Sequence, residues 1–442
     1  DRQKWTASWW WKKGKWNITG DPENLFAAKA SGANNDAVYI HTDEKLYFKQ
    51  EISNTVRTIN GTRRLRDTSG WYHIVIAQDT TQSTAANRVK VWINGQQETM
   101  SGTFPNQNSN GNFSRDIGTY IGSTKSSSNA NPLAESNGYI ADFHFIDGST
   151  LDYTSFAETD SETGVYKPKE YTGSYGTNGF HLTFSDNSDV TASTLGADSS
   201  GNGNNFTPVN MSVAAGPDND SVLDTPTNNY CVLNQNYQNG TEEPGATSNG
   251  NLKFVPNGSE YEMCPGTLPV RDGKYYFEVK HGGGTYLTVG LIRGTGGSYD
   301  QYVGYDPNGQ VHGVGYNRAG TILGASGDGA TNGATLSSDP NSYTTNDIIG
   351  VATDVPNGTV KWYKNNTLEY TLTGLNDHEW FPAVSGYNSS DIAYVNFGQQ
   401  GFNYTPPTGH KAICTDNMAA INIKKPQDYF KPLLYTGTVT GG

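Results

Sequence analysis

Two separate stretches of this chain each pair an aromatic-rich strand pattern with a second strand that ends in an Asn-containing turn. The first stretch covers residues 71–77 and 87–95, and the second covers residues 347–354 and 360–365. Alternation of apolar and polar residues over such lengths is typical of half-buried β-strands, and turn residues between them are typical of hairpins. The two stretches therefore predict an all-β chain with two antiparallel β-sandwiches.

Composition agrees with many short strands joined by tight turns, because the 442 residues include 52 Gly and 12% aromatic but only 17% charged residues. The length suits two or three domains. A net charge of −13 argues against nucleic acid as a partner, since phosphate binding needs a basic patch. No apolar run approaches the roughly 20 residues of a membrane helix, so membrane insertion is not expected. The sequence starts at Asp1 without a signal-peptide pattern, which suggests processing or trimming.

Three cysteines, Cys231, Cys264 and Cys414, lie far apart in the sequence. An odd number at such spacing is not a disulfide framework, and no Cys-x-x-Cys metal pair is present. The preferred interpretation is three buried free thiols, and the alternative is one disulfide between two of them.

The chain divides by composition into four segments. Residues 1–147 and 251–412 carry the two sandwich patterns. Residues 148–250 are rich in Thr, Ser, Asn, Asp and Gly but hold too many aromatic residues for a solvated linker, so we expect a packed, turn-rich connector. Residues 413–442 form an extension with a possible short helix at 426–430 and a strand at 433–435, leading to a further domain.

The first unit resembles the concanavalin A-like (laminin G-like) jelly roll in its WYHIV strand at 71–75, its VKVWING strand at 89–95 and its closing GYIADF strand at 138–143. The second unit resembles the SPRY sandwich. It has the family's YFEV at 276–279, DIIGVATD at 347–354, WYKN at 362–365, WFPA at 380–383 and VNFGQ at 395–399, in that order.

The whole arrangement is similar to bacteriophage tail-fibre and other virion-associated proteins. The connector carries this resemblance through FIDG at 145–148, ETD at 158–160, YTGSYGTNGF at 171–180, DSSGNGNNF at 198–206 and DTPTNN at 224–229. It implies a homo-oligomer that binds other virion proteins and contacts a glycan or protein on the host cell surface, within an extracellular particle.

Two groups of residues are candidates for ligand contact. The run Trp9, Trp10, Trp11 with Trp16 suggests a sugar-stacking platform, for which Trp9 and Trp11 are the candidates, but strand alternation favours core packing. The SPRY resemblance implies binding of peptide segments by loops at residues 293–300 and 319–338, and we expect Arg293 and Tyr299 to contact a ligand.

Oxygen-rich loops give a candidate cation site at Asp218 and Asp220. Ca²⁺ needs six to eight oxygen ligands, and it is the one cofactor that the sequence suggests. None of these loops has EF-hand spacing, so Asx-turn chemistry is the default interpretation.

Glu158, Asp160 and Glu162 have the Glu-x-Asp-x-Glu spacing of laminarinase-type glycosidases, which use paired carboxylates. The residues between them are Thr159 and Ser161 rather than apolar ones, and the motif follows the last strand of the first unit. An acidic surface turn is therefore the preferred interpretation.

We expect a non-enzymatic virion structural protein, a tail fibre or another surface-exposed component that self-assembles and contacts host glycans. Repeated weak contacts on such an assembly gain strength from multivalency. The alternative is a secreted bacterial adhesin or surface-layer protein that binds polysaccharide. A glycoside hydrolase is the least favoured class.

Overall fold

The computed structural model describes residues 1–15, 18, 20–31, 33–125, 132–133, 135–236, 245–258, 260–293, 302–305, 313–324, 334–375 and 378–419. The regular structure within these ranges consists of strands and four 3₁₀ helices, which confirms the all-β prediction. These helices are η1 (Ala85–Asn87), η2 (Tyr153–Ser155), η3 (Val355–Asn357) and η4 (Thr415–Asn417). In the described ranges, no helix has the length and apolar character to cross a bilayer. The helix predicted at 426–430 and the strand at 433–435 lie outside the described residues.

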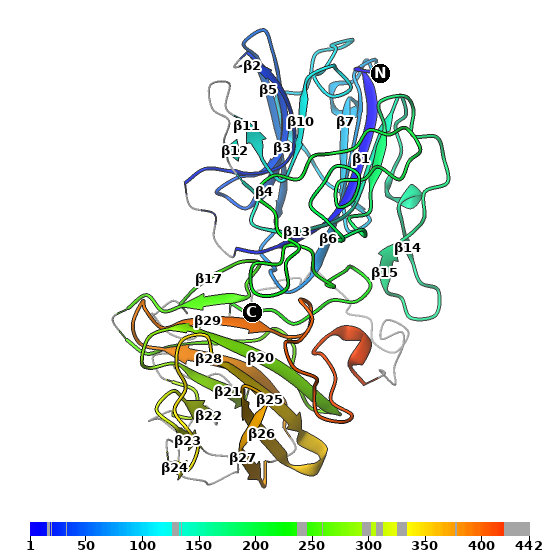
Figure 1. The fold of residues 1–442 in the computed structure, drawn as a ribbon. Coiled ribbons are helices and arrows are strands. Elements are labelled where there is room, and N and C mark those ends of the chain that lie inside the picture. Colours follow the sequence, from blue (N-terminus) through cyan, green and yellow to red (C-terminus); the bar gives the residue numbers. More distant parts are fainter. Residues whose placement is uncertain are drawn as a thin grey trace, which may run out of the picture.

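The first sandwich has two six-stranded sheets (Figure 1). One sheet has the order β16 (Phe180–Leu182), β13 (Gly138–Asp147), β1 (Lys4–Lys13), β6 (Trp71–Asp79), β7 (Val89–Ile93), β8 (Gln96–Gln97). The other has the order β10 (Gly118–Ile121), β2 (Glu23–Ser31), β3 (Asn34–Ile40), β4 (Lys45–Ile52), β5 (Thr55–Arg64), β9 (Ser101–Gly102). Two small two-stranded sheets accompany this sandwich: β11 (Thr124–Lys125) pairs with β12 (Pro132–Leu133), and β14 (Ala157–Thr159) pairs with β15 (Tyr166–Pro168).

Strand β1 lies in the middle of the first sheet, and both of its faces are buried. Alternate residues Trp5, Trp9 and Trp11 are fully buried between the two sheets. Each indole of this size removes about 200 Å² from water. At about 25 cal/mol per Å² that contributes roughly 5 kcal/mol before entropy is counted. Trp10 faces the other way and stacks on His73 at 4.7 Å under Tyr166, so the outer face is covered too.

The second sandwich has a seven-stranded and a six-stranded sheet. The larger has the order β17 (Ala246–Ser248), β18 (Lys253–Val255), β29 (Ile392–Asn396), β20 (Lys274–Gly283), β25 (Ile348–Asp354), β26 (Thr359–Lys364), β27 (Thr367–Thr373). The smaller has the order β19 (Glu262–Pro265), β28 (Trp380–Gly386), β21 (Thr288–Arg293), β22 (Gly313–Asn317), β23 (Thr321–Gly324), β24 (Thr335–Ser337). Trp362 of the larger sheet and Trp380 of the smaller sheet are fully buried in the core between them.

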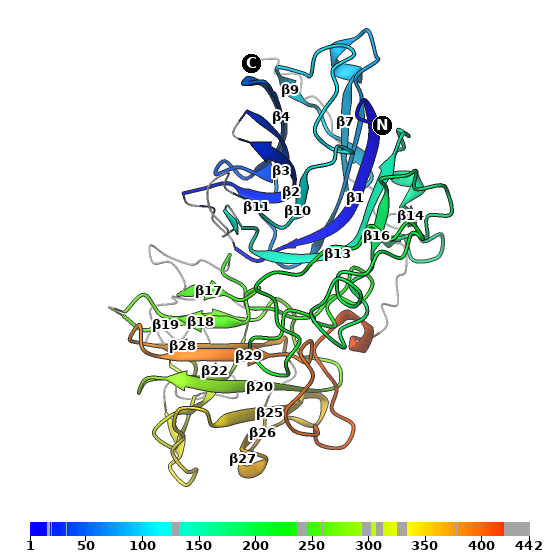
Figure 2. The same cartoon turned by 45° about the horizontal axis from the view of Figure 1, so that its top comes forward.

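The connector packs against both sandwiches. Figures 1 and 2 show it running along the flank of the first sandwich and then across the junction to the second. Its strand β16 pairs with β13, so the first sheet takes in residues beyond 147. Farther along, Leu233 forms a bridge with Gly266 and Tyr230 with Cys414, which ties the connector to the second sandwich.

All three cysteines are buried and free, as the preferred interpretation predicted. Burial raises the pKa of Cys231 to about 11 and also raises the pKa of Cys264 and of Cys414. The thiols therefore stay protonated and unreactive in the folded chain.

Candidate functional site

Trp9 and Trp11 belong to the core of the first sandwich, which corrects their interpretation as a sugar platform. Trp9 stacks on Phe143 with ring centroids 5.1 Å apart, and Trp11 packs against Tyr72 at 5.8 Å. Both indoles have no exposed surface. A sugar needs an open ring face, and neither ring offers one.

The loops predicted from the SPRY resemblance are described in part. Arg293 is the last residue of β21, half-buried and paired in register with Trp380. Tyr299 lies outside the described residues, as do residues 294–301 and 325–333. Tyr286 lies just before the opposite end of β21, so Arg293 is separated by the length of that strand from the aromatic group described next.

Five tyrosines gather at one end of the second sandwich, and we call this group the tyrosine surface. Tyr261 is its centre, with ring centroids 4.9 Å from Tyr302, 4.9 Å from Tyr387 and 6.1 Å from Tyr286. Tyr305 stacks on Tyr302 at 5.1 Å. Tyr286 is 40% exposed and the other four are half-buried, so their rings form part of the protein surface.

A single buried carboxylate holds the two loops that carry Tyr286 and Tyr387. Oδ1 of Asp391 accepts the backbone N–H of Thr285 at 2.6 Å and of Tyr286 at 3.0 Å. Oδ2 accepts the N–H of Tyr387 at 2.9 Å and of Asn388 at 2.8 Å. Hydrogen bonds to a charged group are stronger than neutral ones. The side chain of Asp391 therefore holds the two loops in a fixed position relative to each other.

Glycine is required where the first of these loops passes Asp391. Gly284 has a φ of +89°, and a Cβ there would lie 1.9 Å from Asp391 Oδ1. Any side chain would collide with the carboxylate that orders the loop. Gly284 is thus a structural requirement of the tyrosine surface.

The segment that carries Tyr302 and Tyr305 is a turn, although its sequence suggests a strand. Tyr305 N donates to Tyr302 O at 2.9 Å, and Gly304 has a φ of +96°. Between them Val303 is fully buried, and its N–H donates to Ser385 Oγ at 2.9 Å. Anchoring through Val303 leaves both tyrosine rings on the outside.

The chemistry of the tyrosine surface is that of neutral aromatic rings with hydroxyl groups. Burial, with the neighbouring tyrosines, raises the pKa of Tyr261, and burial also raises the pKa of Tyr302. Both therefore stay phenols at neutral pH. Flat rings with hydroxyl groups suit partners that have an apolar face and polar edges, such as sugars or extended peptides.

The predicted cation residues Asp218 and Asp220 line a cavity of about 860 Å³ between the two sandwiches, together with Glu23, Glu135 and Tyr139. Asp220 Oδ2 accepts the N–H of Ser212 at 2.7 Å, and the backbone N–H of Asp220 donates to the carbonyl of Ser212 at 2.7 Å, so the two residues close a loop. Neither Asp belongs to a group of three or more His, Cys, Asp or Glu side chains with converging donor atoms within the described ranges. Ca²⁺ at this position stays a prediction.

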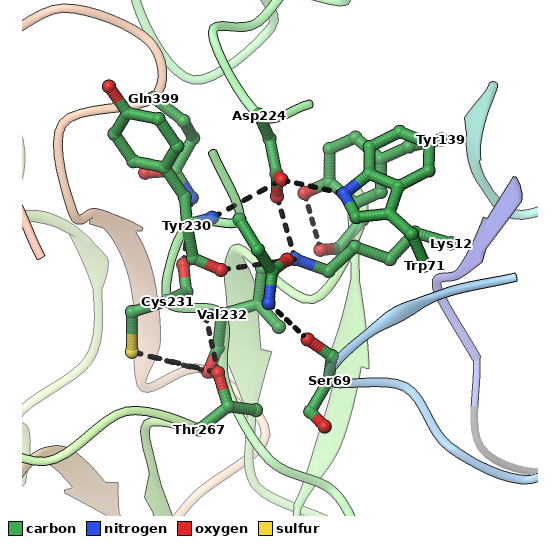
Figure 3. Close-up of polar contacts among 12 residues, drawn as sticks. Lys12, Ser69, Trp71, Tyr139, Asp224, Tyr230, Cys231, Val232, Thr267 and Gln399 are labelled. Carbon is green, nitrogen blue, oxygen red and sulfur yellow. Dashed lines mark hydrogen bonds and ion pairs between the residues drawn. The ribbon is translucent and has the colours of Figure 1, made fainter. Parts of the chain in front are cut away.

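A polar cluster beside this cavity joins the sandwiches (Figure 3). Lys12 of β1 donates to Asp224 Oδ2 at 2.7 Å, to Asn229 Oδ1 at 2.7 Å and to the carbonyl of Tyr230 at 3.0 Å. Trp71 Nε1 donates to the other oxygen of Asp224 at 3.1 Å. Every proton of the ammonium group has an acceptor, so the buried charge is fully compensated.

The acidic motif at Glu158, Asp160 and Glu162 is a surface turn. Asp160 accepts the N–H groups of Glu162 and Thr163 and pairs with Lys167 at 2.8 Å. These contacts hold the pKa of Asp160 far below its usual range. Glu158 and Glu162 are exposed. An arrangement of this kind caps a turn, whereas a glycosidase needs its carboxyl groups on either side of a substrate cleft.

Residues 274–400 match the family model of the SPRY domain, so the chain contains a SPRY domain within its second sandwich. Among solved structures, the human SPRY domain is 17% identical over 33% of this chain and 91% of that chain, with a TM-score of 0.26. The SPRY domain of human HERC1 is 19% identical over 33% of this chain and 87% of that chain, also at 0.26. The mouse laminin alpha1 chain, domains LG4-5, is 9% identical over 91% of this chain and 86% of that chain, at 0.28. SPRY and laminin G-like domains are typically non-catalytic modules that often mediate binding or adhesion.

Sequence reasoning did not find the tyrosine surface. Its members come from four loops between residues 261 and 387, and Asp391 gives no local pattern of its own. The one signal available was the Gly282–Gly284 run, which marks a tight turn directly before Tyr286.

Proposed function

We propose that this chain is a non-enzymatic recognition protein that binds host-surface glycans through the tyrosine surface of its SPRY domain. The main support for this proposal is the arrangement of Tyr261, Tyr286 and Tyr387, two of which lie in loops fixed by the buried Asp391 carboxylate. Rings that are already ordered lose little conformational entropy when a ligand binds, which favours affinity from a small contact.

We further propose that the chain is a structural component of a virus particle, a tail fibre or another surface-exposed part, and that it assembles with itself and with other virion proteins. The order of motifs in residues 145–229 supports this, as does the polar junction that joins the sandwiches. A rigid two-domain unit repeated in an oligomer presents many copies of one weak site.

The test is glycan binding by the full chain, measured on immobilised polysaccharide from candidate host cells. Tyr286→Ala and Tyr387→Ala should each reduce binding at least tenfold, whereas Tyr286→Phe keeps the ring and should retain most of it. Leu368→Ala, which trims a 49%-exposed side chain elsewhere on the same sandwich, is the matched control. Equal binding by all four variants would refute the assignment of the tyrosine surface.

The alternative is a secreted adhesin or surface-layer protein of a bacterium. Immunogold labelling decides between the two, because antibodies to the chain should mark particles in one case and cell envelopes in the other. Release of reducing sugars from a bound polysaccharide by the purified chain would instead support an enzyme and overturn the non-enzymatic part of the proposal.

A further inference from the structure

Three donor side chains converge on the outer face of the first sandwich, away from the tyrosine surface. His144 of β13 and His181 of β16 are direct partners in the antiparallel register, so their side chains lie side by side on one face. Asp142 lies two residues before His144 on the same face. Its carboxylate Oδ1 is 2.7 Å from His181 Nε2 and 3.2 Å from His144 Nε2.

The backbone at Asp142 departs from regular strand geometry. Its φ is +51°, and the register between β1 and β13 shifts between Ser8 and Trp10, opposite this residue. Such a bulge re-aims a side chain, and bulges and left-handed non-glycine residues are over-represented at functional sites. The effect here is that Asp142 Oδ1 meets both histidine rings.

The outer nitrogen of each ring is occupied by a hydroxyl group from the connector. His144 Nδ1 lies 3.0 Å from Tyr175 OH, and His181 Nδ1 lies 2.9 Å from Ser199 Oγ. Ser199 Oγ also lies 3.0 Å from the carbonyl of His181. When that hydroxyl donates to the carbonyl, Nδ1 must be the donor and Nε2 carries a lone pair. Nε2 and the Asp142 carboxylate, 2.7 Å apart, are then two acceptors that either a proton or a metal ion must bridge.

Nε2 of His144 also lacks a partner. Its Nε2 atom is buried without a hydrogen-bond partner of proper geometry, and the residue is only 2% exposed. A cavity of about 260 Å³ opens over the group and is also lined by Lys169, Glu170 and Tyr171. The donor atoms of Asp142, His144 and His181 all lie within 4.8 Å of one another.

We propose that Asp142, His144 and His181 bind one divalent transition-metal ion of the Zn²⁺ class, with a water or a ligand group from the cavity as the fourth donor. Two imidazoles and one carboxylate suit Zn²⁺ rather than Ca²⁺ or Mg²⁺, which prefer oxygen. The Tyr175 and Ser199 hydroxyls supply the outer contacts that orient metal-binding histidines. The two rings lie nearly parallel, with centroids 3.9 Å apart, so binding turns them until both Nε2 atoms point to the ion.

Bound metal would fasten the connector to the first sandwich, because the ligands come from β13 and from β16. A ligand that binds only the folded state stabilises it by an amount that grows with the logarithm of the ratio of its concentration to the dissociation constant. The site lies on a different sandwich from the tyrosine surface, so it does not depend on glycan binding.

The experiment is calorimetric titration of the full chain with ZnCl₂ after removal of metals, together with thermal unfolding and the visible spectrum of the Co²⁺ form. We expect one ion per chain, a rise in Tm, and intense Co²⁺ bands of a four-coordinate site. Asp142→Asn and His181→Gln should weaken binding at least 100-fold, and Ser199→Ala, which leaves all three ligands in place, about tenfold. His410→Asn, outside the group, should bind like the unaltered chain.

Absence of stoichiometric Zn²⁺ binding by the folded, unaltered chain would overturn the proposal, whatever the variants do. Undiminished binding by His181→Gln and Ser199→Ala would also overturn it, because the ion would then lie elsewhere. A Ca²⁺ titration that removes the Co²⁺ bands at equal concentration would show an oxygen site instead and would equally contradict it.

Discussion

Lys12 and Asp224 form an ion pair of 2.7 Å in which both side chains have no exposed surface (Figure 3). The two residues are 212 positions apart, one in the central strand of the first sandwich and the other in the connector beside the second. Tyr139 adds to the same junction: its ring lies 5.5 Å from Lys12 Nζ, and its hydroxyl donates to the carbonyl of Gly250 at 2.7 Å. The sandwiches are thus joined by directional contacts rather than by a loose tether.

Replacing one member of this pair should destabilise the junction strongly. Lys12→Ala leaves the Asp224 carboxylate buried without its partner, and we expect a loss of about 3–5 kcal/mol in the free energy of unfolding. Lys274→Ala is the control, because its pair with Asp354 is 43% exposed on the lysine side and should contribute less than about 1 kcal/mol. Urea denaturation measures both. Equal, small losses would mean that the junction does not depend on the buried charge.

Asp391→Asn should disorder one of the two loops of the tyrosine surface. The amide keeps one acceptor oxygen but turns its NH₂ group toward two backbone N–H donors, so half of the four hydrogen bonds are lost. We expect about 3 kcal/mol of destabilisation and weaker glycan binding. Asp339→Asn, an exposed residue that accepts from the Ser337 hydroxyl, is the control. Unfolding curves and binding should move together, and unchanged binding would argue against loop anchoring.

Stability should fall as pH rises through neutrality because of Glu23. Burial raises the pKa of Glu23 to about 7 in the folded chain, above its ordinary 4.5. A raised folded-state pKa means that the folded chain holds this proton more tightly than the unfolded chain does. The resulting stability is therefore fully present below pH 4.5 and is lost as pH rises through 7, by up to about 3 kcal/mol.

The variant Glu23→Gln removes this dependence. It should unfold at a higher temperature than the unaltered chain at pH 8 and at a similar temperature at pH 4.5. Glu135→Gln, an exposed residue that lines the same cavity, should show no such difference. Burial also raises the pKa of Asp36, to about 6, so the Glu23→Gln variant keeps the part of the pH dependence of stability that comes from Asp36. A parallel shift at both pH values would contradict the assignment.

The three thiols should be unreactive in the folded chain. Because burial raises the pKa of Cys231 to about 11, the thiolate is scarce at pH 8, and Cys264 and Cys414 are equally enclosed. We expect no labelling by a thiol reagent under native conditions and three labels per chain in urea. Addition of a reducing agent should leave Tm unchanged. Native labelling of any cysteine would show that its segment opens.

The strands could be predicted from the sequence because each has its own alternation. The pattern at residues 71–77 corresponds to β6, and the pattern at 347–354 to β25. Burial of the β1 tryptophans followed from alternation as well. Alternation at Tyr302–Tyr305 also suggests a strand, but a buried Val303 and a positive φ at Gly304 make a turn there.

What the sequence could not supply was the pairing of distant segments. The connection of Asp391 with Tyr286 depends on two loops more than a hundred residues apart, and the group of Asp142, His144 and His181 depends on β16 joining the first sheet. Period-two patterns report which face a residue occupies but say nothing about which strand lies beside it.

The central place of β1 has a consequence for the order in which this chain acquires its structure. β1 lies between β6 and β13, so its tryptophan face cannot be enclosed until Asp147 has been synthesised, and Lys12 meets Asp224 later still. Contacts over such separations form slowly, because a long loop must close before any of them is gained. On the ribosome, the strand that carries four tryptophans therefore remains in an unfinished sheet. The nascent chain is most prone to aggregate until β13, the second neighbour of β1, has been synthesised.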